Sequence, residues 1–325
     1  MLGIDIGSNT LRAILMDQNY NKLQSEEFII AAAKNMQNTN INQEAIKRLF
    51  SALNSLKNKN YNLKNAKAVA TAAFRKANNT KEIFEKIKND FGLKIDLIDS
   101  NTEAYLSILG MKTRLQKLNL FRKDFNYCDL GGASCEITNT KFSKSYDFGI
   151  ISFYEKNTFK RSKHNIFVNF FKKNPQRLKF IKNKQLKLHF NNFHPHFKQL
   201  ALEAFKEVQY AKKSLKNKYI ALNSGVPTTL CAYKHGIKYI DYTEEKVNGA
   251  LLTSRDFLIF AIKIWNLEQK KAKIYLGENR KKYLIAGALL LYALFDKEKL
   301  IVVDDGVREG VCIAYFKNII YKGIL

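Results

Sequence analysis

Proline and cysteine are scarce in this chain. Three prolines in 325 residues leave no proline-rich linker to mark a domain boundary. The four cysteines are scattered and form no CxxC pair, which argues against a cysteine zinc cluster and fits a reducing compartment. We therefore expect a cytoplasmic protein with free thiols.

Long hydrophobic runs are also lacking. The longest apolar stretch, YLIAGALLLYALF at residues 283–295, has thirteen residues, whereas a helix needs about 20 to span a bilayer. It predicts a buried core helix, and we expect no membrane association. The chain opens directly on a predicted strand, so we expect no signal peptide. Its length and its 46% apolar content indicate one large or two medium domains.

Acidic residues are outnumbered, because 55 Lys and Arg against 29 Asp and Glu give a formal net charge of +26. Residues 156–198 hold twelve of the basic residues and no acid, with phenylalanines between them. Such a run is typical of a protein that binds a polyanion or a nucleic acid. Lysine-rich proteome bias, or core-facing phenylalanines backed by a solvated basic face, accounts for the same pattern.

What the chain does have is an alternation of strand and helix patterns. Apolar residues at helical spacing, with Asn42 as a cap and Gly92 as a stop, predict two early helices, and Ser254 is the expected cap of a later one. The predicted helices cover residues 42–58, 80–92, 102–118, 199–215, 254–267 and 279–295. The predicted strands are 94–99, 219–223, 299–303 and the first part of 66–75, which runs into a turn. This order predicts an α/β fold of two halves with a cleft between them.

Two unusual turns share one outline. GIDIGSNTLRAIL begins at residue 3, and YCDLGGASCEI covers residues 127–137. Asp129 falls where Asp5 does, and Gly131 falls where Gly7 does. The agreement in register indicates an internal duplication, although two hairpins that match by chance remain the alternative.

The composition of these turns suits phosphate chemistry. A tight turn of Gly, Ser, Asn and Thr directs several backbone N–H groups at one point, which makes an anion nest. An aspartate just before the glycine repels phosphate unless a divalent cation lies between them, and Mg²⁺ bridges carboxylates to phosphate oxygens. Asp5 and Asp129 are therefore candidate metal or water holders. A third turn, NSGVPTT at 223–229, has a similar composition and follows a strand.

Several blocks of this chain resemble the family of exopolyphosphatases and guanosine pentaphosphate phosphohydrolases (Ppx/GppA). The blocks are IDIGSNTLR, ATAAFR, IDSNTEAYLSILG, DLGGASCEI, NSGVPTTL with RKKYLIAGALLL, and DDGVREG. They occur in order over the whole chain. The resemblance implies two ribonuclease-H-like α/β domains of the actin, sugar-kinase and heat-shock-ATPase superfamily. It corresponds to the short form, which lacks the helical C-terminal extension of longer members.

The resemblance also implies domains and roles. Residues 1–120 form the first domain and 121–305 the second, while the last helix, about 306–325, packs back on the first. Glu103 is the implied base that activates water, and Arg75 the implied phosphate-binding arginine of the catalytic pair. The metal set is Asp5, Asp129 and Glu136, holding Mg²⁺, with Mn²⁺ as a substitute. The implied phosphate-binding residues are Ser8, Asn9, Thr10, Arg12, Gly131, Gly132, Ala133, Ser134, Gly225, Thr228 and Arg308.

Some positions depart from the family pattern. Ala133 replaces the third glycine of the second loop, and its methyl narrows a turn that must approach phosphate closely. Thr102 stands where a second glutamate is usual, and Ser152 where an arginine is common. Val226 replaces a glycine and Lys282 an aspartate. These changes bear on substrate range and turnover more than on the fold.

The sequence therefore predicts a phosphohydrolase that removes terminal phosphate from inorganic polyphosphate, from guanosine pentaphosphate, or from both. The substitutions leave room for a catalytically weak protein that binds the same ligands. A sugar-kinase-like ATPase is a further alternative, but VPTT lacks the paired glycines that usually build an adenosine pocket. We expect no specific nucleic-acid partner, and the family leans towards homodimers.

Overall fold

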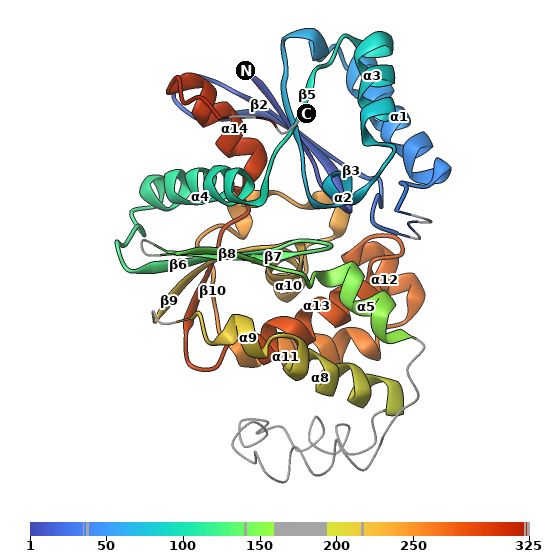
Figure 1. The fold of residues 1–325 in the computed structure, drawn as a ribbon. Coiled ribbons are helices and arrows are strands. Elements are labelled where there is room, and N and C mark those ends of the chain that lie inside the picture. The colour runs from blue at the N-terminus through green and yellow to red at the C-terminus, as the bar shows by residue number, and fades with distance from the viewer. Residues whose placement is uncertain are drawn as a thin grey trace.

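The first sheet of the computed structural model, which describes residues 1–34, 36, 39–139, 142–158, 194–215, 218–321 and 323, contains the opening turn. Its strands are β1 (Leu2–Ile6), β2 (Thr10–Met16), β3 (Lys22–Ile29), β4 (Lys67–Ala70) and β5 (Ile95–Leu97), in the order β3-β2-β1-β4-β5. β1, β2 and β3 form an antiparallel meander, and β4 and β5 continue parallel to β1. The strands run through the upper part of Figure 1.

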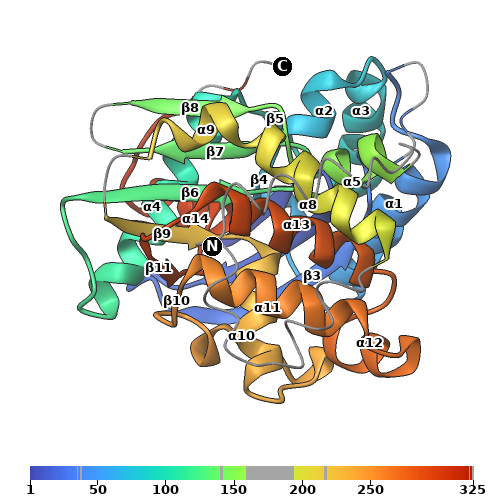
Figure 2. The ribbon, with the colours of Figure 1, turned by 90° about the horizontal axis from the view of Figure 1, so that it is seen from below.

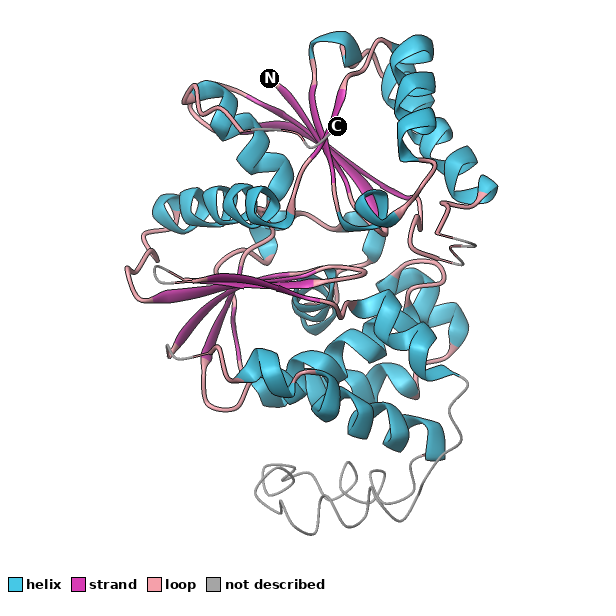
Figure 3. Ribbon diagram, in the orientation of Figure 1, coloured by secondary structure: helices cyan, strands magenta, loops and turns pink. Residues whose placement is uncertain are grey.

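The second sheet repeats this order of strands. Its members are β6 (Phe125–Leu130), β7 (Cys135–Thr138), β8 (Ser143–Tyr146), β9 (Tyr219–Asn223), β10 (Leu251–Leu252) and β11 (Lys299–Val302), in the order β10-β11-β9-β6-β7-β8. Again an antiparallel meander is followed by parallel neighbours, β9 and β11, and β10 adds an antiparallel edge. The matching order supports the predicted duplication, and the predicted α/β fold of two halves is confirmed (Figure 3).

Helices cover both faces of the first sheet. α1 (Gln43–Asn58) and α3 (Thr80–Phe91) bury apolar residues against one face, and the short α2 (Ala72–Lys76) follows β4. α14 (Val307–Phe316) packs on the other face, against β1, β2 and β4. The last helix therefore returns to the first half of the chain.

One helix lies between the two sheets. α4 (Ser100–Lys117) packs Leu106 with α14 on one side, and Met111 and Leu115 with β6, β9 and β11 on the other. A Cβ at Gly310 of α14 would overlap the backbone carbonyl of Leu106, so the two helices cross at backbone contact. Because α4 is buried on two sides, its position is fixed relative to both halves.

The remaining helices cover the far face of the second sheet (Figure 2). They are α5 (Ile150–Thr158), α8 (Pro195–Glu207), α9 (Gln209–Lys212), α10 (Gly225–Lys234), α11 (Ser254–Trp265), α12 (Gln269–Leu276) and α13 (Lys281–Leu294). Residues 63–65, 239–241 and 244–246 form short 3₁₀ turns. α13 contains the longest apolar run and is buried from Leu284 to Leu294, which confirms the predicted core helix.

The structure confirms some of the predicted helix ends and corrects others. Asn42 caps α1 by accepting from the Ala45 N–H, and Gly92 ends α3 in the left-handed region with φ of 67°. The expected helix over 199–215 is wrong in its bounds, because it begins at Pro195 and is divided at Val208. Thr253, not Ser254, caps α11, because Asp256 completes a capping box with it. Among the described residues, every helix is too short or too polar to cross a membrane.

Candidate active site

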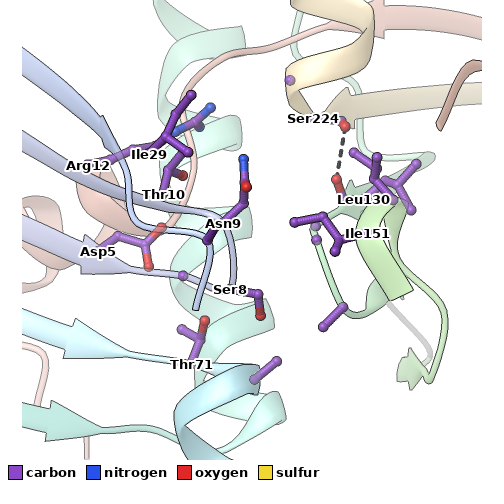
Figure 4. Close-up of a pocket in the computed structure, with 18 of the residues that line it drawn as sticks. Asp5, Ser8, Asn9, Thr10, Arg12, Ile29, Thr71, Leu130, Ile151 and Ser224 are labelled. Atoms are coloured by element: carbon purple, nitrogen blue, oxygen red, sulfur yellow. Dashed lines mark hydrogen bonds between the residues drawn. The ribbon is translucent and has the colours of Figure 1, made fainter. Parts of the chain in front are cut away.

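A cavity of about 310 Å³ opens between the two halves. It lies where β1, β4, β6 and β9 end, the edge at which open α/β sheets bind ligands. Figure 4 shows Asp5, Ser8 and Asn9 of the first half facing Leu130 and Ile151 of the second. The predicted residues in its lining are Asp5, Ser8, Asn9, Thr10, Arg12, Glu103, Asp129, Gly131, Gly132, Ala133, Ser134, Gly225 and Arg308.

The two predicted phosphate loops, residues 7–10 and 131–134, have the same hydrogen-bond pattern. The Gly7 N–H donates to the Thr10 carbonyl at 2.9 Å, and the Gly131 N–H donates to the Ser134 carbonyl at 3.0 Å. The loop carbonyls also accept from the segments that follow, at 30–33 in the first half and 150–152 in the second. Because the N–H of a trans peptide points away from its C=O, the next N–H of each loop is turned the other way, as an anion nest requires.

The loops of the two halves touch at Gly132. A Cβ at this position would lie 3.3 Å from the Ser8 Cβ and 3.5 Å from the Asn9 Cβ. A side chain there would push the two loops apart. Glycine therefore lets both loops approach one ligand from opposite sides.

A third turn supports the second loop. The Ser224 hydroxyl, at the start of α10, donates to the Leu130 carbonyl at 2.8 Å (dashed line in Figure 4). Gly225 lines the cavity, whereas Thr228 is buried one turn along the helix and donates to the Ser224 carbonyl at 3.2 Å. The structure thus brings Gly225, but not the Thr228 side chain, to the site.

Buried carboxylates crowd the inner end of the site. Asp5, Glu103 and Asp129 line the cavity, while Glu136 lies beneath the second loop and accepts from the Ser145 hydroxyl at 2.8 Å. Strand pairing explains the last placement, because Glu136 is opposite Asp129 as Arg12 is opposite Asp5. The Ser107 hydroxyl donates to Asp129 Oδ2 at 2.6 Å. Asp5 Oδ1, in contrast, is buried without a hydrogen-bond partner.

Burial raises the pKa of all four carboxyl groups. The pKa of Asp5 rises to about 7, through burial first and the charge of Glu103 second. That of Glu136 rises to about 8 through burial, Glu103 and Asp129. Burial also raises the pKa of Glu103 and of Asp129. A cation among them would favour the ionised forms.

The donor set fits a magnesium ion that is shared with a substrate. Among the described residues, no three His, Cys, Asp or Glu side chains converge as a complete metal cage. Mg²⁺ does not need one, since it is usually held by one or two carboxylates together with phosphates and water. Asp5, with its unpaired buried oxygen, and Asp129 are the residues that face the cavity for this role. Glu136 lies behind them, outside the lining.

Glu103 is held by Arg75. It stands in the first turn of α4, which Asp99 caps by accepting from the Thr102 N–H at 2.7 Å. Arg75 Nη1 contacts Glu103 Oε2 at 2.7 Å and the Ile98 carbonyl at 2.9 Å. Arg75 itself is outside the cavity lining, so in this arrangement it orients the glutamate from behind.

Arg12 and Arg308 reach the cavity from a buried network of charges. Arg12 pairs with Glu27 at 3.0 Å and with Asp304 at 3.9 Å. Arg308 pairs with Glu309 at 2.6 Å, and Asp304 lies 4.0 Å away. The acids fix both guanidinium groups beside the loops, where a phosphate would meet them.

A model of the Ppx/GppA phosphatase family matches residues 23–318. The chain belongs to the Ppx/GppA phosphatase family. The members of this family are described as phosphatases.

Individual relatives agree with this family. The bifunctional 3-dehydroquinate synthase/phosphatase of Fusobacterium nucleatum is 24% identical over 343 aligned positions, covering 97% of this chain and 46% of that protein. The chain thus spans less than half the length of this relative. The Aquifex aeolicus Ppx/GppA family member has a TM-score of 0.67 at 21% identity, covering 99% of this chain and 98% of that one. An exopolyphosphatase from Cytophaga hutchinsonii has a TM-score of 0.73 at 17% identity, covering 99% of each chain. These structures share the two-domain fold.

The sequence prediction missed three cations that line the cavity, Lys34, Arg48 and Arg280. Arg280 lines the cavity, lies 4.9 Å from the ring centre of Tyr239 and is 3.4 Å from Thr229 Oγ1. A Cβ at Gly225 would lie 3.2 Å from its Nη2. The arginine opens the RKKYLIAG block, so the signal was a charged residue just before an apolar helix. Thr71 and Glu27 also line the cavity without having been predicted, and so do Asn223 and Ser224, of which the sequence analysis singled out only the turn that contains them.

Three of the family departures, Ala133, Ser152 and Val226, lie in or near the second loop. The Ser152 hydroxyl accepts from the Gly149 N–H at 2.9 Å. Ala133 is 9% exposed, and a Cβ at Gly149 would overlap its backbone. Val226 is buried, and a Cβ at Gly287 would lie 2.5 Å from it. The side chains present thus fill the space under the loop.

Proposed function

We propose that this protein releases terminal orthophosphate from inorganic polyphosphate, guanosine pentaphosphate or both, with Mg²⁺. The observation that carries the proposal is the meeting of two phosphate loops with a buried glutamate and two aspartates in one cavity. Phosphoryl transfer to water requires a positioned phosphate, neutralised charge and an oriented nucleophile. The cavity contains a candidate for each requirement.

The loops and the arginines would hold the substrate. Ser8 and Thr10 of the first half and Ser134 of the second line the same cavity, and the backbone N–H groups of their loops would bind the phosphate there. Arg12 and Arg308 add positive charge from the same side. Arginine binds phosphate in a bidentate manner, so a terminal phosphate and its neighbour would be fixed in line with the attacking water.

Asp5 and Asp129 would hold the divalent cation against the phosphate oxygens. When bound, Mg²⁺ neutralises phosphate charge and polarises the P–O bonds. The pKa of Asp5 is raised to about 7, and a cation bound beside this carboxyl group would favour its ionised form. Mn²⁺ offers similar oxygen coordination and is the expected substitute.

Glu103 would accept the proton of the attacking water. The water oxygen bonds to the terminal phosphorus, the bridging P–O bond breaks, and the shortened chain leaves with the bridging oxygen. Burial raises the pKa of Glu103, although Arg75 opposes the rise. A carboxylate with a raised pKa is a better proton acceptor near neutral pH. Arg75 keeps that carboxylate at one orientation through its 2.7 Å contact.

Phosphate release from a panel of substrates tests the proposal. The panel contains short and long polyphosphates, guanosine pentaphosphate and ATP, each with Mg²⁺ and with a chelator. We expect the release of orthophosphate from polyphosphate or guanosine pentaphosphate in the samples with Mg²⁺ and not in those with the chelator. Binding of these ligands without release would identify a binding protein instead, and release from ATP alone would favour the kinase-like alternative.

A further inference from the structure

Ser107 links the helix of the proposed base to the proposed metal ligand. Its hydroxyl donates to Asp129 Oδ2 at 2.6 Å, across the boundary between the two sheets. Ser107 is 2% exposed, so solvent hardly competes for this bond. We infer that Ser107 is a positioning residue, which fixes the Asp129 carboxylate relative to Glu103 and so sets the affinity for the divalent cation.

α4 holds Glu103 and Ser107 at fixed positions relative to each other. Ser107 follows Glu103 by four residues, so both side chains lie on one face of the helix, one turn apart. α4 is clamped on both sides, with Leu106 against α14 and Leu115 against the second sheet. The hydrogen bond from Ser107 to Asp129 therefore holds the Asp129 carboxylate, which precedes the second loop, at a fixed position relative to α4.

The carboxylates of Asp5 and Asp129 differ in their hydrogen bonds. Asp5 and Asp129 occupy the same place in the duplicated turn and face the same cavity. Asp5 Oδ1 is buried without a partner, whereas one oxygen of Asp129 is engaged by Ser107. Asp129 is thus the oriented member of the pair, and Ser107 is what makes it so.

Metal affinity is the quantity that this arrangement would control. A hydrogen bond that fixes a ligating carboxylate limits its rotation, and removing such a partner typically costs about 10–100-fold in metal affinity. The inference rests on the proposed role of Asp129 as a metal ligand. The experiment must therefore distinguish two negative results: that Ser107 does not affect metal affinity, and that Asp129 does not bind the metal.

The test is a set of Mn²⁺ titrations followed by electron paramagnetic resonance, in saturating orthophosphate. We expect Ser107→Ala to weaken Mn²⁺ binding about 10–100-fold. Thr113→Ala is the matched control, because it removes a hydroxyl from the same helix that donates only to the Leu109 carbonyl, at 2.8 Å; it should bind Mn²⁺ as the wild type does. Ser107→Cys keeps the volume with a weak donor and replaces Ser107→Ala if that variant does not fold.

A double variant decides whether Ser107 acts through Asp129. If it does, adding Ser107→Ala to Asp129→Asn should cause little further loss, since coupled residues are not additive. Unchanged Mn²⁺ affinity in a folded Ser107 variant, or losses that multiply in the double variant, would overturn the inference. If Asp129→Asn alone leaves the affinity unchanged, the proposed metal role fails as well.

Discussion

At the scale of single residues, local sequence motifs predicted the acids and the loop residues of the site. They did not predict the residues of other elements that contact them. Asp5, Glu103 and Asp129 stand at fixed places in strand-turn and helix-start patterns, so the sequence predicted that they would meet. Ser107 and Arg280 act through contacts between elements far apart in the chain. A local pattern shows a polar residue at each position but not the distant residue that it contacts, which is why both were missed.

The Asp129 carboxylate is expected to matter for metal use. Asp129→Asn keeps the shape and the acceptor for Ser107 but removes the charge that attracts Mg²⁺. We expect a higher Mg²⁺ concentration for half-maximal phosphate release, by about tenfold or more. The measurement is a Mg²⁺ titration of activity, with Asp17→Asn on the exposed turn after β2 as the control. A titration that does not move would make Asp129 a turn residue only.

At the scale of elements, helix ends and apolar runs were predictable, whereas breaks inside helices were not. Asn42, Gly92 and the run 283–295 carry strong local signals, and all three behave as expected. The break at Val208 occurs without glycine or proline, so it depends on packing that the sequence pattern does not show. The predicted domain limits stay predictions, although α14 packs against α4 and the first sheet.

The start of α14 depends on Glu309. This carboxylate accepts from the Gly306 N–H at 2.8 Å and pairs with Arg308 at 2.6 Å and Lys22 at 3.3 Å. Burial opposes its ionisation, but Arg308 and Lys22 hold its pKa at about 2, below the ordinary 4.5. Its contribution is therefore present above pH 4.5 and is lost as the pH falls from 4.5 towards 2.

Glu309→Gln tests this contribution. Breaking a buried ion pair costs about 3–5 kcal/mol, so we expect a loss of that order in the free energy of unfolding in urea at pH 7. The difference from the wild type should shrink as the pH falls below 4.5. Glu85→Gln, on the exposed face of α3, is the control. A difference that stays constant with pH would contradict the ion-pair account.

The close crossing of α4 and α14 gives a second stability prediction. Gly310→Ala places a methyl group where the Leu106 carbonyl lies, and overpacking a core costs typically about 1–3 kcal/mol. We expect a lower free energy of unfolding in urea by at least this amount. Asn54→Ala, on the exposed face of α1, should change it by less than about 0.5 kcal/mol. Wild-type stability in Gly310→Ala would show that the helices separate easily.

At the scale of the whole molecule, the net charge of +26 suits a polyanionic substrate. The densest basic run, 156–198, lies mostly outside the described residues. We predict that it guides long polyphosphate chains towards the cavity. Binding that is driven by charge should weaken steeply with salt. Short substrates, held by the loops, should respond less.

Four neutralising changes test the guide. Replacing Lys172, Lys173, Arg177 and Lys179 with glutamine should raise the KM for long polyphosphate and leave that for short substrates nearly unchanged. The reason is that only a long chain extends beyond the cavity. Steady-state kinetics at several salt concentrations give the measurement. An equal loss on both substrates would mean a structural segment, and no loss on either would favour proteome bias and the nucleotide substrate.

The central claim is that the two halves meet to present a phosphate to water beside Glu103. Phosphate release by Glu103→Gln tests it most directly, since glutamine keeps the contact with Arg75 and cannot accept the proton. Loss of a general base typically costs about 10²–10⁴-fold, so we expect release to fall by that factor while substrate binding stays intact. Glu82→Gln, exposed on α3, should behave as the wild type. Unchanged turnover in Glu103→Gln would contradict the account.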